Sequence, residues 1–182
     1  MVVLEHTYFQ LFTSIFVTDS AIDVILNALA VIILDAFIDS AFNHTRYLGI
    51  FFFSALLGNA LTLLLGPIYS SAGASGGIFG LFAATFAYRW AEDKKIDRGT
   101  LILFAAIFVS SSIIPGVNWM AHVGGSIGGF IAGPLLYFAL KKKLMNYESI
   151  SDSAESTKLI TWGLILFMII GSAVQFYLFV TG

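Results

Sequence analysis

The sequence predicts an all-α fold, a polytopic helical bundle that lies in a membrane, and two observations lead to this prediction. Of the 182 residues, 58% are hydrophobic and only 11% are charged, and the mean hydropathy is +0.91. A water-soluble domain of this length does not expose so much apolar surface. In addition, residues 47–88 and 99–140 contain no charged residue. Each of these windows is about twice the roughly 20 residues that a helix needs to cross a bilayer.

Turn residues divide each uncharged window into two helices. In the first window the segment GPIYSSAG begins at Gly66, and in the second the segment PGVN begins at Pro115. Gly, Pro, Ser and Asn favour turns over helices. Each window therefore predicts a helical hairpin.

One further helix is expected before the hairpins and one after them, at about residues 21–38 and 159–180. The intervening segment KKKLMNYESISDSAESTK is polar and rich in Ser. The prediction is thus six transmembrane helices. It divides the chain into a membrane core, a polar cytoplasmic linker and a further C-terminal helix, at residues 1–140, 141–158 and 159–182.

The basic residues predict the orientation of these helices. All nine fall in loops on one side of the predicted bundle: Arg46, Arg89, Lys94, Lys95, Arg98, Lys141, Lys142, Lys143 and Lys158. Because Lys and Arg mark cytoplasmic loops, that side is expected to face the cytoplasm, and the cell membrane is the expected location. Nine scattered basic residues are too few for a nucleic-acid surface. With no cysteine in the chain, thiolate metal sites are excluded, and neither a metal nor a cofactor is expected.

Ionisable residues inside a membrane are costly and are therefore candidates for function. The predicted spans contain three, Asp23, Asp35 and His122. Ser75 lies 14 residues before Arg89, and His122 lies 19 residues before Lys141. At the helical rise of 1.5 Å per residue, these two side chains stand roughly 21 and 28 Å above the inner face. Both therefore fall in the outer half of the bilayer.

Small residues follow Ser75 and His122 at the four-residue spacing that lets helix backbones approach closely: Gly76, Gly80, Gly125 and Gly129. If the two helices packed through these glycines, the His122 imidazole and the Ser75 hydroxyl group would lie close together. Serine hydrolysis uses such a pair as base and nucleophile. The alternative is that His122 and Ser75 only bond neighbouring carbonyl groups and that the glycines only pack helices.

Several motifs resemble those of the rhomboid intramembrane proteases. They are LFTSIFVTDS, SALLGNALTLL and GASGGIFGLFAA in the first half of the chain, and AHVGGSIGGFIAG from Ala121. The resemblance covers roughly residues 8–140. It implies a rhomboid-like bundle in which Ser75 is the nucleophile and His122 the general base, a dyad without a third carboxylate. The expected activity is hydrolysis of peptide bonds in or near transmembrane segments of membrane proteins.

The resemblance also assigns supporting residues. Asn27 matches the asparagine of the family's oxyanion hole, Gly73 opens the GxSG motif, and Phe79 matches an aromatic residue that stacks on the histidine. Asn27 could instead bond a neighbouring helix, and Phe79 could be an ordinary core residue.

The chain departs from the family at several positions. Asp23 and Thr18 stand where the family usually has histidines, and Phe9-Gln10 stands where many members have Trp-Arg. An ionised Asp23 beside a developing oxyanion would oppose catalysis, unless it is protonated or turned toward outer water. A solvated acid at a helix entrance is the simplest interpretation of Asp23.

The termini differ as well. The chain begins inside the family's outer loop, so the family's first helix is expected to be missing, and the helix after Lys158 is an addition. A start further upstream, a fragment and a compact variant all fit this expectation.

Two other functions compete with proteolysis. A catalytically impaired relative that binds membrane clients would keep the fold, although such relatives typically lack the serine or the histidine. A transporter or channel would predict inverted repeats or several charges in the spans, and the two hairpins are not similar in sequence. The expected partners are transmembrane substrates and the lipid bilayer, and the sequence does not predict an oligomeric state.

Overall fold

The computed structural model describes residues 10–18, 20–35, 37–38, 42–65, 73–95 and 98–145. In this part of the chain all regular structure is helical, so the all-α prediction is confirmed. The elements are α1 (Gln10–Thr13), the 3-10 helix η1 (Ser14–Phe16), α2 (Ala21–Asp35), α3 (His44–Leu65), α4 (Ser75–Asp93), α5 (Arg98–Ser112) and α6 (Trp119–Met145). Phe9, the segment of residues 66–72 and the expected helix at 159–180 lie outside the described residues.

The helix ends agree closely with the turn residues of the sequence. Helix α3 ends at Leu65, directly before the GPIYSSAG segment, and α5 ends at Ser112, three residues before Pro115. Two ends differ. Helix α2 ends at Asp35, so this acid lies at a helix end and not deep within a span. Helix α6 continues to Met145 and enters the predicted linker, because Lys and Leu are good helix formers and cations are favourable at a helix C-terminus.

Two of the described helices are by themselves long and apolar enough to cross a membrane. They are Thr45–Leu65 of α3, with 21 residues, and Trp119–Lys141 of α6, with 23 residues. The α1–η1 segment and α2 pass the same test together but are bent by 82°. Helix α5 is apolar but shorter, and most of α4 is buried by its neighbours instead of facing lipid. These apolar helices support an integral membrane protein.

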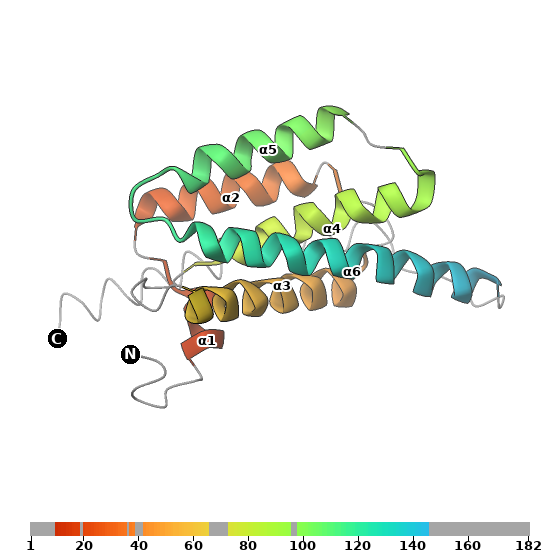
Figure 1. The fold of residues 1–182 in the computed structure, drawn as a ribbon, viewed down its shortest axis with the longest axis horizontal. Helices are drawn as coiled ribbons and strands as arrows, with labels where there is room; N and C mark the ends of the chain where they lie inside the picture. Colours follow the sequence, from red (N-terminus) through yellow and green to blue (C-terminus); the bar gives the residue numbers. More distant parts are fainter. Residues whose placement is uncertain are drawn as a thin grey trace.

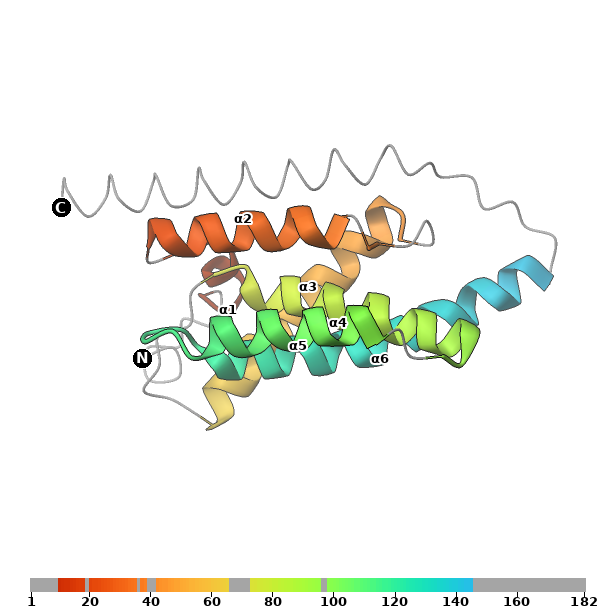
Figure 2. The ribbon, with the colours of Figure 1, turned by 90° about the horizontal axis from the view of Figure 1, so that it is seen from above.

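Helix α4 lies in the middle of the bundle. Helices α3 and α6 pack against it and against each other, and the contact between α4 and α6 is the most extensive. Helices α2 and α5 touch α4 on its other side and make far fewer contacts. They overlap in Figure 1 but lie well apart when the molecule is seen from above in Figure 2. Three helices thus form a tight unit, and α2 and α5 flank it.

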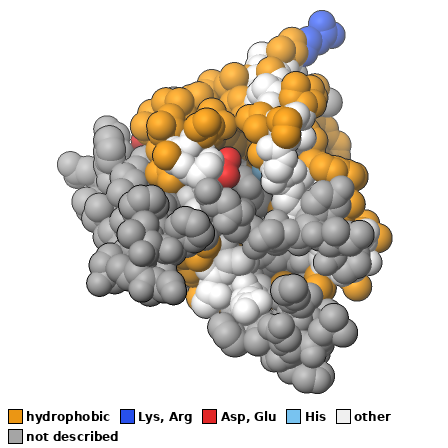
Figure 3. Space-filling view, turned by 90° about the vertical axis from the view of Figure 1, so that its left-hand side faces the viewer, with side chains coloured by type: hydrophobic (Ala, Val, Ile, Leu, Met, Phe, Trp, Pro, Cys, Tyr) orange, Lys and Arg blue, Asp and Glu red, His pale blue; other side chains and the backbone are white. Residues whose placement is uncertain are grey.

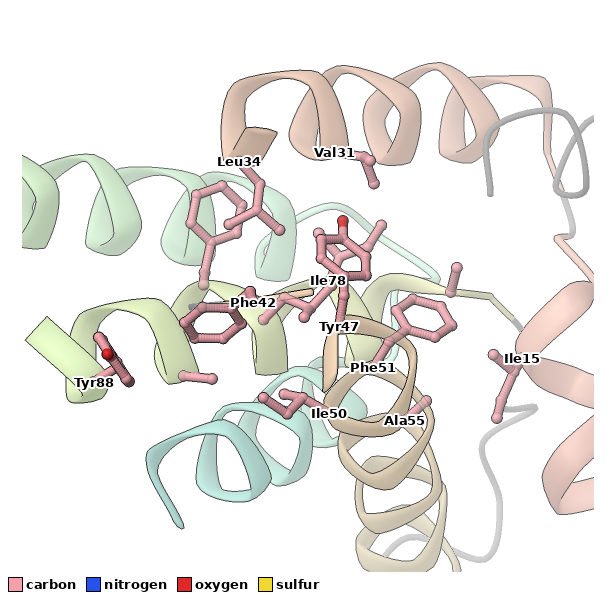
Figure 4. Close-up of a cluster of buried hydrophobic side chains, with 14 of the residues drawn as sticks. Ile15, Val31, Leu34, Phe42, Tyr47, Ile50, Phe51, Ala55, Ile78 and Tyr88 are labelled. Atoms are coloured by element: carbon pink, nitrogen blue, oxygen red, sulfur yellow. The ribbon is translucent and has the colours of Figure 1, made fainter. Parts of the chain in front are cut away.

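The hydrophobic core joins α2, α3 and α4 (Figure 4). Val31 and Leu34 of α2 meet Tyr47 and Phe51 of α3 and Ile78 of α4, and all five are at most 2% exposed. These contacts fix the second half of α2 to the unit formed by α3, α4 and α6.

Glycines allow the backbones of α4 and α6 to touch. A Cβ atom on Gly125 would overlap the backbone carbonyl group of Gly76, and a Cβ atom on Gly129 would overlap that of Gly80. Any side chain at these positions would push the helices apart. The close approach brings the first turns of α4 and α6 side by side at one end of the bundle.

The two ends of the bundle differ in charge. The described basic residues lie at the end where α2 finishes and α3 and α5 begin, on the right in Figure 1. One of them, Arg89, donates a hydrogen bond of 2.8 Å from Nη2 to the carbonyl oxygen of Phe37. The first turns of α4 and α6 lie at the opposite end.

Candidate active site

Ser75 and His122 meet where α4 and α6 begin. Ser75 is the first residue of α4 and His122 is the fourth residue of α6. The His122 Nε2 atom lies 3.0 Å from the Ser75 Oγ atom, a hydrogen-bonding distance. His122 is 1% exposed, and Ser75 is partly buried. This geometry can transfer a proton from a hydroxyl group to an imidazole.

A glycine with a positive φ angle brings the chain into α4. Gly73 has a φ of 115°, a conformation that side chains other than hydrogen disfavour. Its N–H group donates a hydrogen bond of 2.9 Å to the carbonyl oxygen of Ser14, which ties the start of α4 to η1. The helix begins two residues later at Ser75 without a side-chain cap. Its first N–H groups therefore have no partner within the helix and carry partial positive charge.

Asn118 fixes the start of α6. Its Oδ1 atom accepts a hydrogen bond of 3.3 Å from the N–H group of Ala121, and its Nδ2 atom donates one of 2.9 Å to Thr62 Oγ1. The residue therefore caps α6 and ties it to α3. The sequence pattern predicted only a turn at Asn118, although Asn directly before an apolar helix is a known start signal.

Aromatic rings surround the imidazole of His122. The ring centroids of Phe79 and His122 are 4.4 Å apart with an angle of 39° between the planes. Phe108 of α5 lies at 6.1 Å with an angle of 69°. Phe79 is 4% exposed and also contacts Phe104 and Phe108, so it is a core residue and a neighbour of the histidine at once.

The second imidazole nitrogen also has a partner. The His122 Nδ1 atom lies 3.0 Å from the Oγ atom of Ser112, the last residue of α5. No sequence motif predicted a role for Ser112. The available signal was a run of three serines at the end of an apolar helix, which by itself has no specific meaning.

A cavity of about 570 Å³ lies beside this pair. Its walls come from α2, the first turns of α4, α5 and the turn between α5 and α6. Asn27 lines it, is 8% exposed, and makes no side-chain hydrogen bond within the described residues. Gly73, Ser75 and His122 line it as well. The cavity therefore brings a free amide group into the space that holds the hydroxyl and the imidazole.

Asp23 belongs to the same cavity wall. It lies in the first turn of α2, where its N–H group donates a hydrogen bond of 3.1 Å to Ser20 Oγ. The carboxylate is partly buried, and an acid in this position is favourable for the helix dipole. Figure 3 looks onto this end of the molecule, where acidic and histidine side-chain atoms are visible between hydrophobic surfaces. Asp23 thus lies in the first turn of α2 and also lines the cavity.

A hydrogen-bonded anchor holds the segment before α2 against the bundle. Asn59 of α3 donates from Nδ2 to the carbonyl oxygen of Leu11 at 2.7 Å and to Ser14 Oγ at 3.0 Å. The carbonyl oxygen of Ser14 also accepts the hydrogen bond from the Gly73 N–H group. By holding Ser14 in place, Asn59 therefore stabilises the turn that leads into Ser75. Among the described residues, no group of three or more His, Cys, Asp and Glu side chains is arranged to hold a metal ion.

Comparison with known proteins adds to this geometry. A family model described as "Rhomboid domain" matches residues 5–139. The chain is 32% identical to RHOMBOID-like protein 1 of Arabidopsis thaliana, over 73% of this chain and 36% of that protein. It is 27% identical to Rhomboid-like protease 3 of Toxoplasma gondii, over 72% of this chain and 51% of that protein.

A bacterial relative is similar to the same degree. The chain is 27% identical to Rhomboid protease GluP of Bacillus subtilis (strain 168), over 74% of this chain and 27% of that protein. The chain thus spans about a quarter to a half of the length of these three curated relatives. No solved structure matches it.

Proposed function

Because this chain belongs to the rhomboid family, we propose that it is an intramembrane serine protease that hydrolyses peptide bonds in or near transmembrane segments of other proteins. Two of the relatives above carry the name protease, which supports hydrolysis. The observation that carries the proposal is the distance of 3.0 Å between His122 Nε2 and Ser75 Oγ beside a cavity.

In the proposed reaction Ser75 Oγ attacks the carbonyl carbon of the scissile bond while its proton passes to His122 Nε2. The tetrahedral intermediate collapses, the C–N bond breaks, and His122 gives the proton to the leaving amine. Water then attacks the acyl-enzyme ester, with His122 again accepting and returning a proton. Ser75 is thereby regenerated and the second fragment leaves as a carboxylic acid.

The negative charge on the intermediate requires hydrogen-bond donors that are already in position. We propose that the first N–H groups of α4 and the amide group of Asn27 supply them. The Asn27 amide has no partner within the described residues, and the N-terminus of α4 has no side-chain cap, which supports this assignment. Phe79 would hold the imidazole plane, and Gly73 would allow the turn that presents Ser75.

The substrate and the water would enter from different directions. Helices α2 and α5 form the cavity walls and make few contacts with the rest of the bundle, so a transmembrane helix would reach the cavity between them. Water would enter from the end of the bundle that carries no described basic residue, because hydrocarbon excludes it. This end is proposed to face the non-cytoplasmic side.

The proposal is tested with the purified 182-residue chain in liposomes and a reporter protein with one transmembrane helix. We expect cleavage by the wild type, and a loss of kcat of at least about 10³-fold in Ser75→Ala and in His122→Ala. Ser54→Ala is the matched control, since Ser54 is buried in the bundle, bonds no partner among the described residues and lies outside the cavity lining. A fluorophosphonate should label the wild type and not Ser75→Ala. Identical fragments from wild type and both variants would refute the assignment.

A catalytically impaired relative is the second candidate, and one observation favours it. Asp23 lines the cavity, where an ionised carboxylate would oppose the developing oxyanion. This candidate predicts that the wild type binds a transmembrane client stably but neither cleaves it nor reacts with a fluorophosphonate in any of several lipids.

A further inference from the structure

We infer that Ser112 is a positioning residue that accepts a hydrogen bond from the Nδ1–H group of His122 and so holds the imidazole with Nε2 free to act as a base. This inference rests on the proposed function. It extends the expected pair to three residues, Ser112, His122 and Ser75. Ser112 Oγ lies 3.0 Å from His122 Nδ1, and Ser75 Oγ lies 3.0 Å from His122 Nε2.

The chemistry of imidazole gives this chain a direction. A neutral imidazole carries its proton on one nitrogen only, and the nitrogen without a proton is the one that can accept. If Nε2 is to take the proton of Ser75, the ring proton must reside on Nδ1. A partner at Nδ1 that accepts a hydrogen bond stabilises this tautomer. A hydroxyl group can donate or accept, and the oxygen of Ser112 lies at the distance from Nδ1 that lets it accept.

Ser112 differs from the two serines that precede it. The hydroxyl groups of Ser110 and Ser111 donate to the carbonyl oxygens of Ile107 and Phe108 in their own helix, at 3.2 and 3.1 Å. That is the usual structural role of serine in an apolar helix. The Ser112 hydroxyl group makes no such bond within the described residues and lies instead against the histidine of another helix.

A hydroxyl group also suits the surroundings of this ring. His122 is 1% exposed and is flanked by Phe79 and Phe108, so a carboxylate at Nδ1 would pay a large cost of desolvation. A neutral hydroxyl group orients the ring at a smaller cost. It also stabilises the imidazolium ion less than a carboxylate does, so its contribution should be modest.

The decisive measurement reads the position of the proton directly. The chain has three histidines, and replacing His6 and His44 by Gln leaves His122 as the single ¹⁵N-labelled imidazole in liposomes. We expect the nitrogen chemical shifts of the parent chain to show the proton on Nδ1. In Ser112→Ala a substantial fraction should move to the Nε2–H tautomer, and Ser112→Thr should restore the parent spectrum. An unchanged tautomer in Ser112→Ala would overturn the inference.

Kinetics separate positioning from structure. Ser112→Ala should lower kcat by about tenfold with KM unchanged, as expected for the loss of one neutral hydrogen bond, and Ser112→Thr should recover most of it. Ser54→Ala controls for the loss of a buried hydroxyl group and should keep the wild-type kcat. A fall in kcat without a change of tautomer would mean a purely structural role and would also overturn the inference. If the wild type does not cleave, the proposed function fails, and the tautomer still decides whether Ser112 orients His122.

Discussion

Two asparagines line the cavity, and their hydrogen bonds give them different roles. Both polar atoms of the Asn118 side chain are engaged, one with the N–H group of Ala121 and the other with Thr62. The Asn27 amide has no partner within the described residues although it is 8% exposed. An amide group that lines a cavity without a protein partner is available to a ligand or a transition state in that cavity.

Asn27→Ala should therefore lower kcat by roughly 10²- to 10³-fold, the usual effect of removing one oxyanion donor, with little change in KM. The measurement is the steady-state cleavage of the transmembrane reporter in liposomes. Ile25→Ala on the same helix is the matched control, because Ile25 is 58% exposed and does not line the cavity. Equal loss of activity in both variants would point to general damage of α2 and not to a lost donor.

The sequence predicted the site unevenly at the scale of residues. Ser75 and His122 stand in motifs whose spacing carries meaning. The depth estimate put them roughly 7 Å apart along the membrane normal, and the structure has His122 Nε2 at 3.0 Å from Ser75 Oγ. Ser112 stands in no motif, and Asn59 stands in SALLGNALTLL, where the resemblance assigned it no role. Their roles depend on which helices become neighbours, and a single sequence does not contain that information.

At the scale of helices, the contact between α4 and α6 is the feature on which the site depends. Gly125 and Gly129 face the carbonyl groups of Gly76 and Gly80, so the separation of the two backbones is set by the absence of side chains. Ser75 and His122 lie at the first turns of the same two helices. A small increase in helix separation would therefore lengthen the distance between their reacting atoms.

Gly129→Ala should lower the free energy of unfolding by about 1–3 kcal/mol, because overpacking of a close contact costs this much. Gly49→Ala in α3 is the control, since a Cβ atom there meets nothing within 4 Å. The control should be neutral or stabilising by up to about 1 kcal/mol, because Ala is the better helix former. Thermal unfolding in detergent, followed by tryptophan fluorescence, measures both. Equal effects of the two substitutions would show that Gly129 serves no close contact.

The sequence predicted the helices better than their packing. Uncharged windows and turn residues located the ends of α3 and α5 within a few residues, because bilayer thickness and turn chemistry act locally. The same patterns missed the short elements α1 and η1, whose position depends on Asn59, and the extension of α6 to Met145. They also gave no sign that α2 and α5 would flank the tight unit as cavity walls.

For the whole molecule, the separation of charge along the bundle predicts its orientation in the membrane. The described basic residues gather at one end, and the cavity and the first turns of α4 and α6 lie at the other. If the basic end faces the cytoplasm, the proposed active site takes its water from the opposite side, so orientation determines where cleavage products are released.

The chain contains no cysteine, which makes this orientation directly testable. Pro115→Cys places a thiol in the turn between α5 and α6 beside the cavity, and Lys95→Cys places one between α4 and α5. Both positions are exposed in the bundle. In intact bacterial host cells that express each variant, a membrane-impermeant maleimide should label Pro115→Cys and leave Lys95→Cys unlabelled. Permeabilised cells should give labelling of both, and the wild type supplies the blank. Labelling of Lys95→Cys alone in intact cells would reverse the orientation and would move the water entrance of the proposed active site to the cytoplasm.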